Sequence, residues 1–95
     1  MFGITRTYII NVIGPISAIN ESQVSYNKYP IVCITKRGID HVWENEQVKE
    51  SILDTVNLLG TENIEKSFVH VRIVDRDANI SDEEFELKEI VEKWK

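Results

Sequence analysis

The segment from Asn45 to Gly60 constrains the fold more than any other part of the chain. Its apolar residues recur at i, i+4, i+8 and i+11, which is the spacing of one face of an α-helix. Asn45 stands where a side chain can cap the first turn, and Gly60 stands where a left-handed C-terminal turn favours glycine. The pattern predicts a helix with a buried stripe formed by Val48, Ile52, Val56 and Leu59 and widened by Leu53 and Leu58.

Runs rich in β-branched and aromatic residues occur on both sides of this helix and favour extended backbone. Apolar side chains on both faces of the first run indicate an inner strand, and Arg37-Gly38 is expected to form a tight turn. Residues 16–29 are expected to be mostly loop, apart from a short strand around Val24 and Tyr26. The predicted strands are residues 6–13, a short strand around Val24 and Tyr26, residues 31–35, a return strand at 39–43, and residues 68–74.

A second helix is predicted from Asp82 to about Trp94. Ser81 and Glu84 have the spacing of a capping box, in which a hydroxyl and a carboxylate each accept an amide proton near the helix start. The element order is then β-β-β-α-β-α. This order predicts a single α+β domain over residues 1–95, with a mostly antiparallel sheet of about four strands and two helices on one face. The buried stripe of the second helix is expected to contain Leu87, Ile90, Val91 and Trp94.

Charge is unevenly distributed along the chain, which has a net charge of −5. Residues 1–43 hold four Lys or Arg against two Asp or Glu, whereas residues 44–95 hold seven against fourteen. An acidic half argues against direct nucleic-acid binding, which needs a cationic footprint, and favours a protein partner with a basic surface. No apolar run approaches the ~18 residues of a membrane span, so no membrane association is expected. A single cysteine, Cys33, excludes an intrachain disulfide and suits the reducing cytoplasm.

The outer face of the predicted second helix carries one aromatic side chain among carboxylates. Phe85 lies on one line with acidic residues at positions i, i+7 and i+10 of that helix. An apolar anchor inside a charged rim is typical of a protein-binding hot spot, although a lone exposed aromatic also occurs on surfaces without a partner. The predicted partner-binding residues are Asp82, Phe85, Glu86, Glu89 and Glu92.

An alternative site lies on the strand at residues 68–74, where Phe68, His70 and Arg72 share one face. Histidine can transfer protons near neutral pH and arginine can hold a phosphate. These residues would suit a nucleotide-binding protein or a small phosphodiesterase-like enzyme. No glycine-rich loop, no paired carboxylates at a known spacing and no nucleophile–base pair accompany them, so the sequence favours a non-catalytic protein.

Residues 75–85 are similar to an EF-hand calcium loop in their Asp-x-Asp-x-Asn opening and Ile-Ser-x-Glu-Glu-Phe close. Two residues are missing between Asn79 and Ile80, and the glycine of the sharp turn is absent. We therefore expect a polar turn at residues 75–79, with no metal and no cofactor. Cys33 is expected to be a small buried apolar residue and not a nucleophile.

These observations favour a small acidic binding protein that acts by occupying the surface of a basic, nucleic-acid-handling protein. A non-catalytic inhibitor or modulator of this kind would resemble in general character the anti-defence proteins of viruses and mobile elements. The alternative is the nucleotide-binding or phosphodiesterase-like protein that would use His70 and Arg72. A homodimer whose binding surface is its own is a third possibility.

Overall fold

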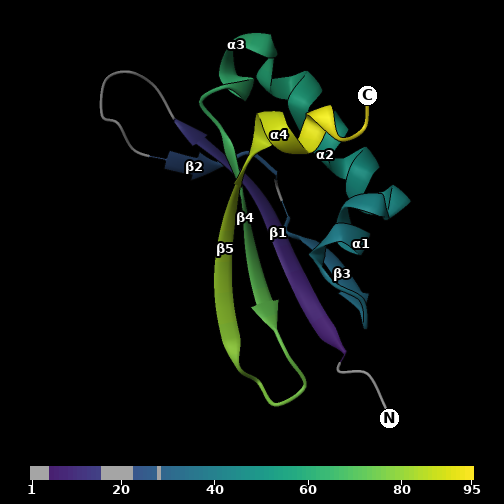
Figure 1. The fold of residues 1–95 in the computed structure, drawn as a ribbon. Helices are drawn as coiled ribbons and strands as arrows, with labels where there is room; N and C mark the ends of the chain where they lie inside the picture. Colours follow the sequence, from purple (N-terminus) through teal and green to yellow (C-terminus); the bar gives the residue numbers. More distant parts are fainter. Residues whose placement is uncertain (1–4, 16–22, 28) are drawn as a thin grey trace.

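The computed structural model of the chain describes residues 5–15, 23–27 and 29–95. Within these residues an antiparallel sheet of five strands carries four helices on one face (Figure 1), which confirms the α+β class and the antiparallel sheet. None of the described helices is long and apolar enough to span a bilayer. In chain order the elements are β1 Arg6–Pro15, β2 Gln23–Ser25, β3 Ile31–Thr35, α1 Ile39–Glu44, α2 Glu46–Leu59, α3 Thr61–Ile64, β4 Phe68–Val74, β5 Ile80–Glu86 and α4 Leu87–Glu92.

Strand β1 lies at the centre of the sheet, as its apolar residues on both faces predict. One edge of β1 pairs with β4 from Thr7 to Ile13. The other edge pairs with β3 over Arg6–Ile10 and with β2 over Ile13–Pro15. Between these two partners the Val12 amide donates to the Asn27 Oδ1 at 2.6 Å, and the Val12 carbonyl accepts from the Tyr26 amide at 2.8 Å. Residues 23–27 of the expected 16–29 loop are therefore bonded to β1, and residues 16–22 and 28 lie outside the described residues.

The core lies between one face of the sheet and the helices. Helix α2 begins as predicted, because the Asn45 Oδ1 accepts from the amides of Gln47 and Val48 at 3.0 and 3.1 Å. It ends at Gly60, where φ is 79°. The predicted stripe is mostly confirmed, but Leu58 is 83% exposed and does not widen it. The fully buried side chains from the sheet, α1, α2 and α4 include Ile10, Val12, Val69, Val71, Val42, Val48, Ile52, Leu87 and Ile90, with Val56, Val91 and Trp94 partly buried around them.

The prediction of a return strand at residues 39–43 is wrong, because this segment forms helix α1. Val42 and Trp43 are adjacent in sequence and both are buried, at 0% and 3% exposure. A strand would direct these neighbours to opposite faces of the sheet, whereas a helix places Ile39, Val42 and Trp43 on one side at i, i+3 and i+4. The sequence contains this i, i+3, i+4 spacing, but interpreting Arg37-Gly38 as a tight turn favoured a strand after it.

The prediction of a helix from Asp82 is wrong for its first half, because residues 80–86 form strand β5 and only residues 87–92 form helix α4. The hydroxyl and carboxylate of Ser81 and Glu84 therefore make no capping box. Seven residues of β5 pair in antiparallel register with β4, from Val74 opposite Ile80 to Phe68 opposite Glu86. These non-local backbone pairs outweigh the weak local preference of an acidic segment for a helix.

Candidate functional site

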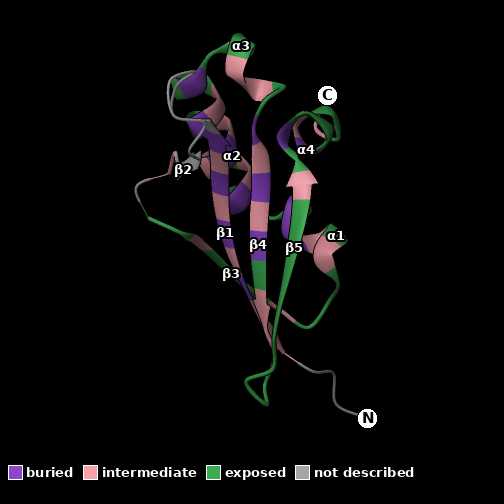
Figure 2. Ribbon diagram, turned by 90° about the vertical axis from the view of Figure 1, so that its left-hand side faces the viewer, coloured by how far each residue is buried: buried purple, intermediate pink, exposed green. Residues whose placement is uncertain are grey.

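The face of the sheet opposite the helices is the principal unpartnered surface of the described residues. No described helix lies over it (Figure 1), and exposed residues follow β3 and β5 in Figure 2. Three of its aliphatic side chains are strongly exposed, namely Val32 at 55%, Ile34 at 65% and Ile80 at 60%. We call this surface the open face.

Strand register arranges the open face in rows that cross the sheet. Because antiparallel partners lie directly opposite one another, side chains of one row contact each other across neighbouring strands. One row is apolar except for a threonine. The next row is apolar on β3 and β1 and charged on β4 and β5. The first row is Ile34, Thr7, Val74 and Ile80, and the second is Val32, Ile9, Arg72 and Asp82.

The charged end of the second row is a small hydrogen-bonded network. Arg72 Nε donates to the Asp82 Oδ1 at 2.9 Å, and His70 Nε2 lies 3.3 Å from the same oxygen. The hydrogen bond from Arg72 lowers the pKa of Asp82, and its partner Asp82 raises the pKa of Arg72. Asp82 therefore stays ionised and offsets the positive charge of this part of the face.

The three residues of the alternative site do lie together, since Phe68, His70 and Arg72 share the open face of β4. Sequence reasoning missed their neighbour, because Asp82 was assigned to a helix. A phosphate at this site would have to compete with the Asp82 carboxylate for Arg72. Assigning residues 80–86 to a strand would have predicted this pairing of Asp82 with Arg72, since antiparallel register then places the two residues opposite each other.

The predicted partner-binding residues do not form one line. Asp82 and Glu86 lie on the open face of β5, whereas Glu89 and Glu92 are exposed on α4. The prediction that Phe85 is exposed is wrong: its ring packs edge-on against Trp43, with ring centroids 5.4 Å apart and an interplanar angle of 79°. Alternation along β5 turns Phe85 toward the core. The role of the four carboxylates in partner binding stays a prediction.

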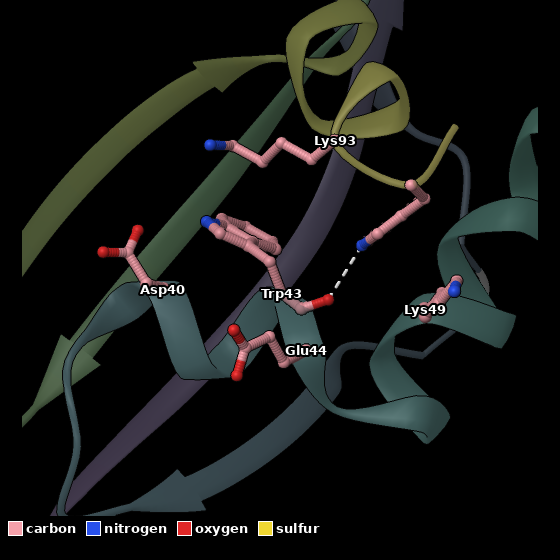
Figure 3. A pocket seen from close by; sticks show the side chains of 6 residues that line it. Asp40, Trp43, Glu44, Lys49 and Lys93 are labelled. Atoms are coloured by element: carbon pink, nitrogen blue, oxygen red, sulfur yellow. Dashed lines mark hydrogen bonds between the residues drawn. The ribbon is translucent and has the colours of Figure 1, made fainter.

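A hollow of about 540 Å³ lies beside Trp43, between α1, the start of α2 and the end of α4 (Figure 3). Two of its lining residues are hydrogen-bonded to each other, since the Trp94 indole donates to the Trp43 carbonyl at 2.8 Å. Two lysines and two carboxylates surround the hollow, so opposite charges offset each other and favour no ligand of either sign. The lining residues are Asp40, Trp43, Glu44, Lys49, Lys93 and Trp94.

A second hollow of about 430 Å³ lies between α2 and the segment that leads into β3. Its most exposed apolar side chains are Tyr29 at 71% and Leu58 at 83%. Because this hollow exposes apolar side chains away from the open face, it is a second candidate binding surface. Experiments on the open face can use Leu58 as a matched position.

The turn at residues 75–79 has the expected polar character. The Asp75 carboxylate accepts from the amides of Asp77 and Asn79 at 2.8 and 2.9 Å and from the Asn79 side chain at 3.1 Å. The hydrogen bonds from Asn79 lower the pKa of Asp75. Its oxygens thus stabilise the turn that joins β4 to β5.

Cys33 is buried at 6% exposure, as predicted, and burial raises the pKa of its thiol. A protonated, enclosed thiol is a poor nucleophile. Among the described residues, no group of three or more His, Cys, Asp or Glu side chains gathers in a way that could hold a metal ion.

Comparison with known proteins adds no relative to this description. No protein-family model, no curated protein and no solved structure matches the chain.

Proposed function

We propose that this chain is a non-catalytic binding protein that covers a basic surface of a protein partner with the open face of its sheet. The observation that carries the proposal is the uncovered face itself, with Val32, Ile34 and Ile80 more than half exposed beside charged residues. An apolar centre with a polar rim is the usual anatomy of a protein interface. Isolated aliphatic side chains are common on surfaces, but these lie on one face and fall in two neighbouring rows.

The charge of the open face favours a basic partner. Asp82, Glu84 and Glu86 follow one another on this face of β5, and Arg72 is the only arginine or lysine of β4 and β5. A regular row of negative charges is also what a nucleic-acid backbone presents to its binding proteins. The specific form of the proposal is an inhibitor that occupies the nucleic-acid-binding surface of its target, as a viral or mobile-element anti-defence protein would.

The phosphate-binding alternative has less support from the same geometry. Arg72 is paired with Asp82, and the next carboxylate along β5, Glu84, lies directly opposite His70. An anionic ligand would therefore approach a surface where Arg72 is already paired with a carboxylate and a second carboxylate lies beside it. Like charges repel most strongly where they are least screened, so this face is better suited to a cationic partner.

The experiment is affinity capture from cell extract with the parent protein and with Ile34→Asp, at low and high salt. Leu58→Asp is the matched control, since it places the same charge on an exposed leucine of α2. Circular dichroism should show that all three proteins are folded. We expect basic proteins to be retained by the parent and by Leu58→Asp, and to be lost with Ile34→Asp. Salt near 1 M should weaken retention, because it shortens screening to about 3 Å.

Three outcomes would contradict the proposal. Equal retention by Ile34→Asp would exclude the open face, and loss with Leu58→Asp alone would place the interface at the Tyr29–Leu58 hollow. A parent that is dimeric by light scattering and becomes monomeric on Ile34→Asp would show that the face binds a second copy of the chain.

A further inference from the structure

The outer edge of β5 carries backbone groups that no described strand pairs. The sheet order ends at β5, and α4 simply continues from its last residue. In Figure 1 the β4–β5 hairpin extends beyond the helices, so this edge is open toward the turn. An unpaired strand edge is a template on which another extended chain can form hydrogen bonds.

Two hydrogen bonds at the ends of the β4–β5 ladder determine which residues of β5 face outward. The Asp75 amide donates to the Asn79 carbonyl at one end, and the Leu87 amide donates to the Ser67 carbonyl at the other. Antiparallel ladders alternate between hydrogen-bonded and non-hydrogen-bonded pairs. Counting inward from either of these two hydrogen bonds gives the same set of hydrogen-bonded residues on β5. The inward-bonded residues of β5 are Ser81, Glu83 and Phe85, and the residues whose amides and carbonyls face the free edge are Ile80, Asp82, Glu84 and Glu86.

We infer that an extended basic segment of the partner adds to this edge as a further antiparallel strand, with Lys or Arg at every second position. The inference rests on the proposed function and specifies how the basic partner is held. Asp82, Glu84 and Glu86 each have a backbone amide and carbonyl that face the free edge and a carboxylate that lies on the open face. A partner residue opposite Asp82 or Glu84 would therefore form backbone hydrogen bonds and a cross-strand ion pair at the same position.

Charge selects this occupant over a second copy of the chain. Two antiparallel β5 edges would bring carboxylates directly opposite carboxylates, and such like-charge pairs destabilise a sheet. Charged residues on an edge strand commonly prevent self-association for this reason. A cationic strand reverses the sign of the same interaction. Basic arms of nucleic-acid-binding proteins supply extended segments of this composition, which links this binding mode to the target class proposed above.

The test uses the parent protein and the synthetic peptide Thr-Lys-Val-Lys-Val-Lys-Thr, with binding followed by fluorescence anisotropy at physiological salt. In antiparallel addition the lysines lie opposite the acidic residues, so their amides point toward β5 and the valine amides point away. N-methylation of the lysine amides should weaken binding about tenfold or more, since it removes several net hydrogen bonds. N-methylation of the valine amides should leave binding within about twofold, since those groups face solvent.

The protein offers a matched pair of variants for the charge term. Glu84→Gln and Glu83→Gln both remove one carboxylate from an exposed residue of β5, but the Glu83 side chain lies on the opposite face of the strand. Glu84→Gln should weaken peptide binding several-fold, and Glu83→Gln should have a clearly smaller effect, because screening at this salt acts over roughly 8 Å.

Each outcome bears on the inference. Sensitivity to lysine methylation, together with the difference between the two variants, would support strand addition. A peptide that binds equally well with methylated lysine amides would overturn strand addition while leaving a basic partner in place. A parent peptide that binds no better than its version with glutamate in place of lysine would also overturn it. The capture experiment described above is separate from the peptide experiment, and its three contrary outcomes would refute the proposed function.

Discussion

Phe85 provides the sharpest test of the β5 assignment, because a strand and a helix place this ring in different environments. On β5 it packs against the buried Trp43 and belongs to the border of the core. Replacing a fully buried phenylalanine with alanine costs about 3–5 kcal/mol. Since Phe85 is only partly buried, we expect Phe85→Ala to lower the free energy of unfolding by about 2–3 kcal/mol. Phe85→Leu keeps most of the apolar volume and should lose about 1 kcal/mol, the size of an edge-on aromatic contact.

The assay is urea unfolding followed by far-ultraviolet circular dichroism. With an m value of about 1 kcal/mol per molar for a small domain, the loss for Phe85→Ala lowers the midpoint by about 2–3 M. Leu58→Ala is the control, since its side chain is 83% exposed and surface changes stay within about 0.5 kcal/mol. If Phe85→Ala unfolds at the same urea concentration as Leu58→Ala, Phe85 does not pack against Trp43 and residues 80–86 are not the strand described above.

Three further predictions concern other parts of the fold. Asn45→Ala should cost about 1 kcal/mol in urea unfolding, because it removes the side-chain cap of α2; an unchanged midpoint would contradict this. Gly14→Ala should cost about 1–3 kcal/mol, because the added methyl group would lie 2.5 Å from both the Tyr26 ring and the Ser67 Oγ; a variant as stable as the parent would mean that both side chains move aside without cost. The lowered pKa of Asp82 predicts a stabilisation that is present above about pH 4, the usual aspartate pKa, and is lost as pH falls through the lower folded-state value. The stability difference between the parent and Arg72→Gln should therefore be larger at pH 7 than near pH 2, and a constant difference would exclude the ion pair as its source.

The candidate site was only half predictable. A two-residue period is enough to place Phe68, His70 and Arg72 on one face of β4, and the pattern predicted them there. Their neighbour Asp82 arrives from β5, whose acidic sequence has little intrinsic preference for a strand. The exposed aliphatic side chains of Val32 and Ile34 were likewise not identified as a surface, because a short continuous apolar run does not show which of its two faces the helices will cover.

Local sequence is sufficient to predict the conformation of a segment whose own residues stabilise its backbone. Helix α2 has a side-chain cap, a repeated apolar stripe and a terminal glycine, and each of these acts within a few residues of the backbone that it satisfies. The inner position of β1 also followed from its apolar residues on both faces, and the extent of β4 followed from side-chain alternation.

Tertiary contacts decided the conformation of residues 39–44 and 80–86. Both segments are too short to form a stable isolated helix, which needs about 12–15 residues in water, so their partners determine the outcome. Residues 39–44 become helical because the core accepts Val42 and Trp43 on the same side. Residues 80–86 become extended because the turn at Asp75 brings the chain back alongside β4, with which it forms seven residue pairs. Backbone hydrogen bonds of that kind depend on the position of another strand, and no pattern within residues 80–86 specifies it.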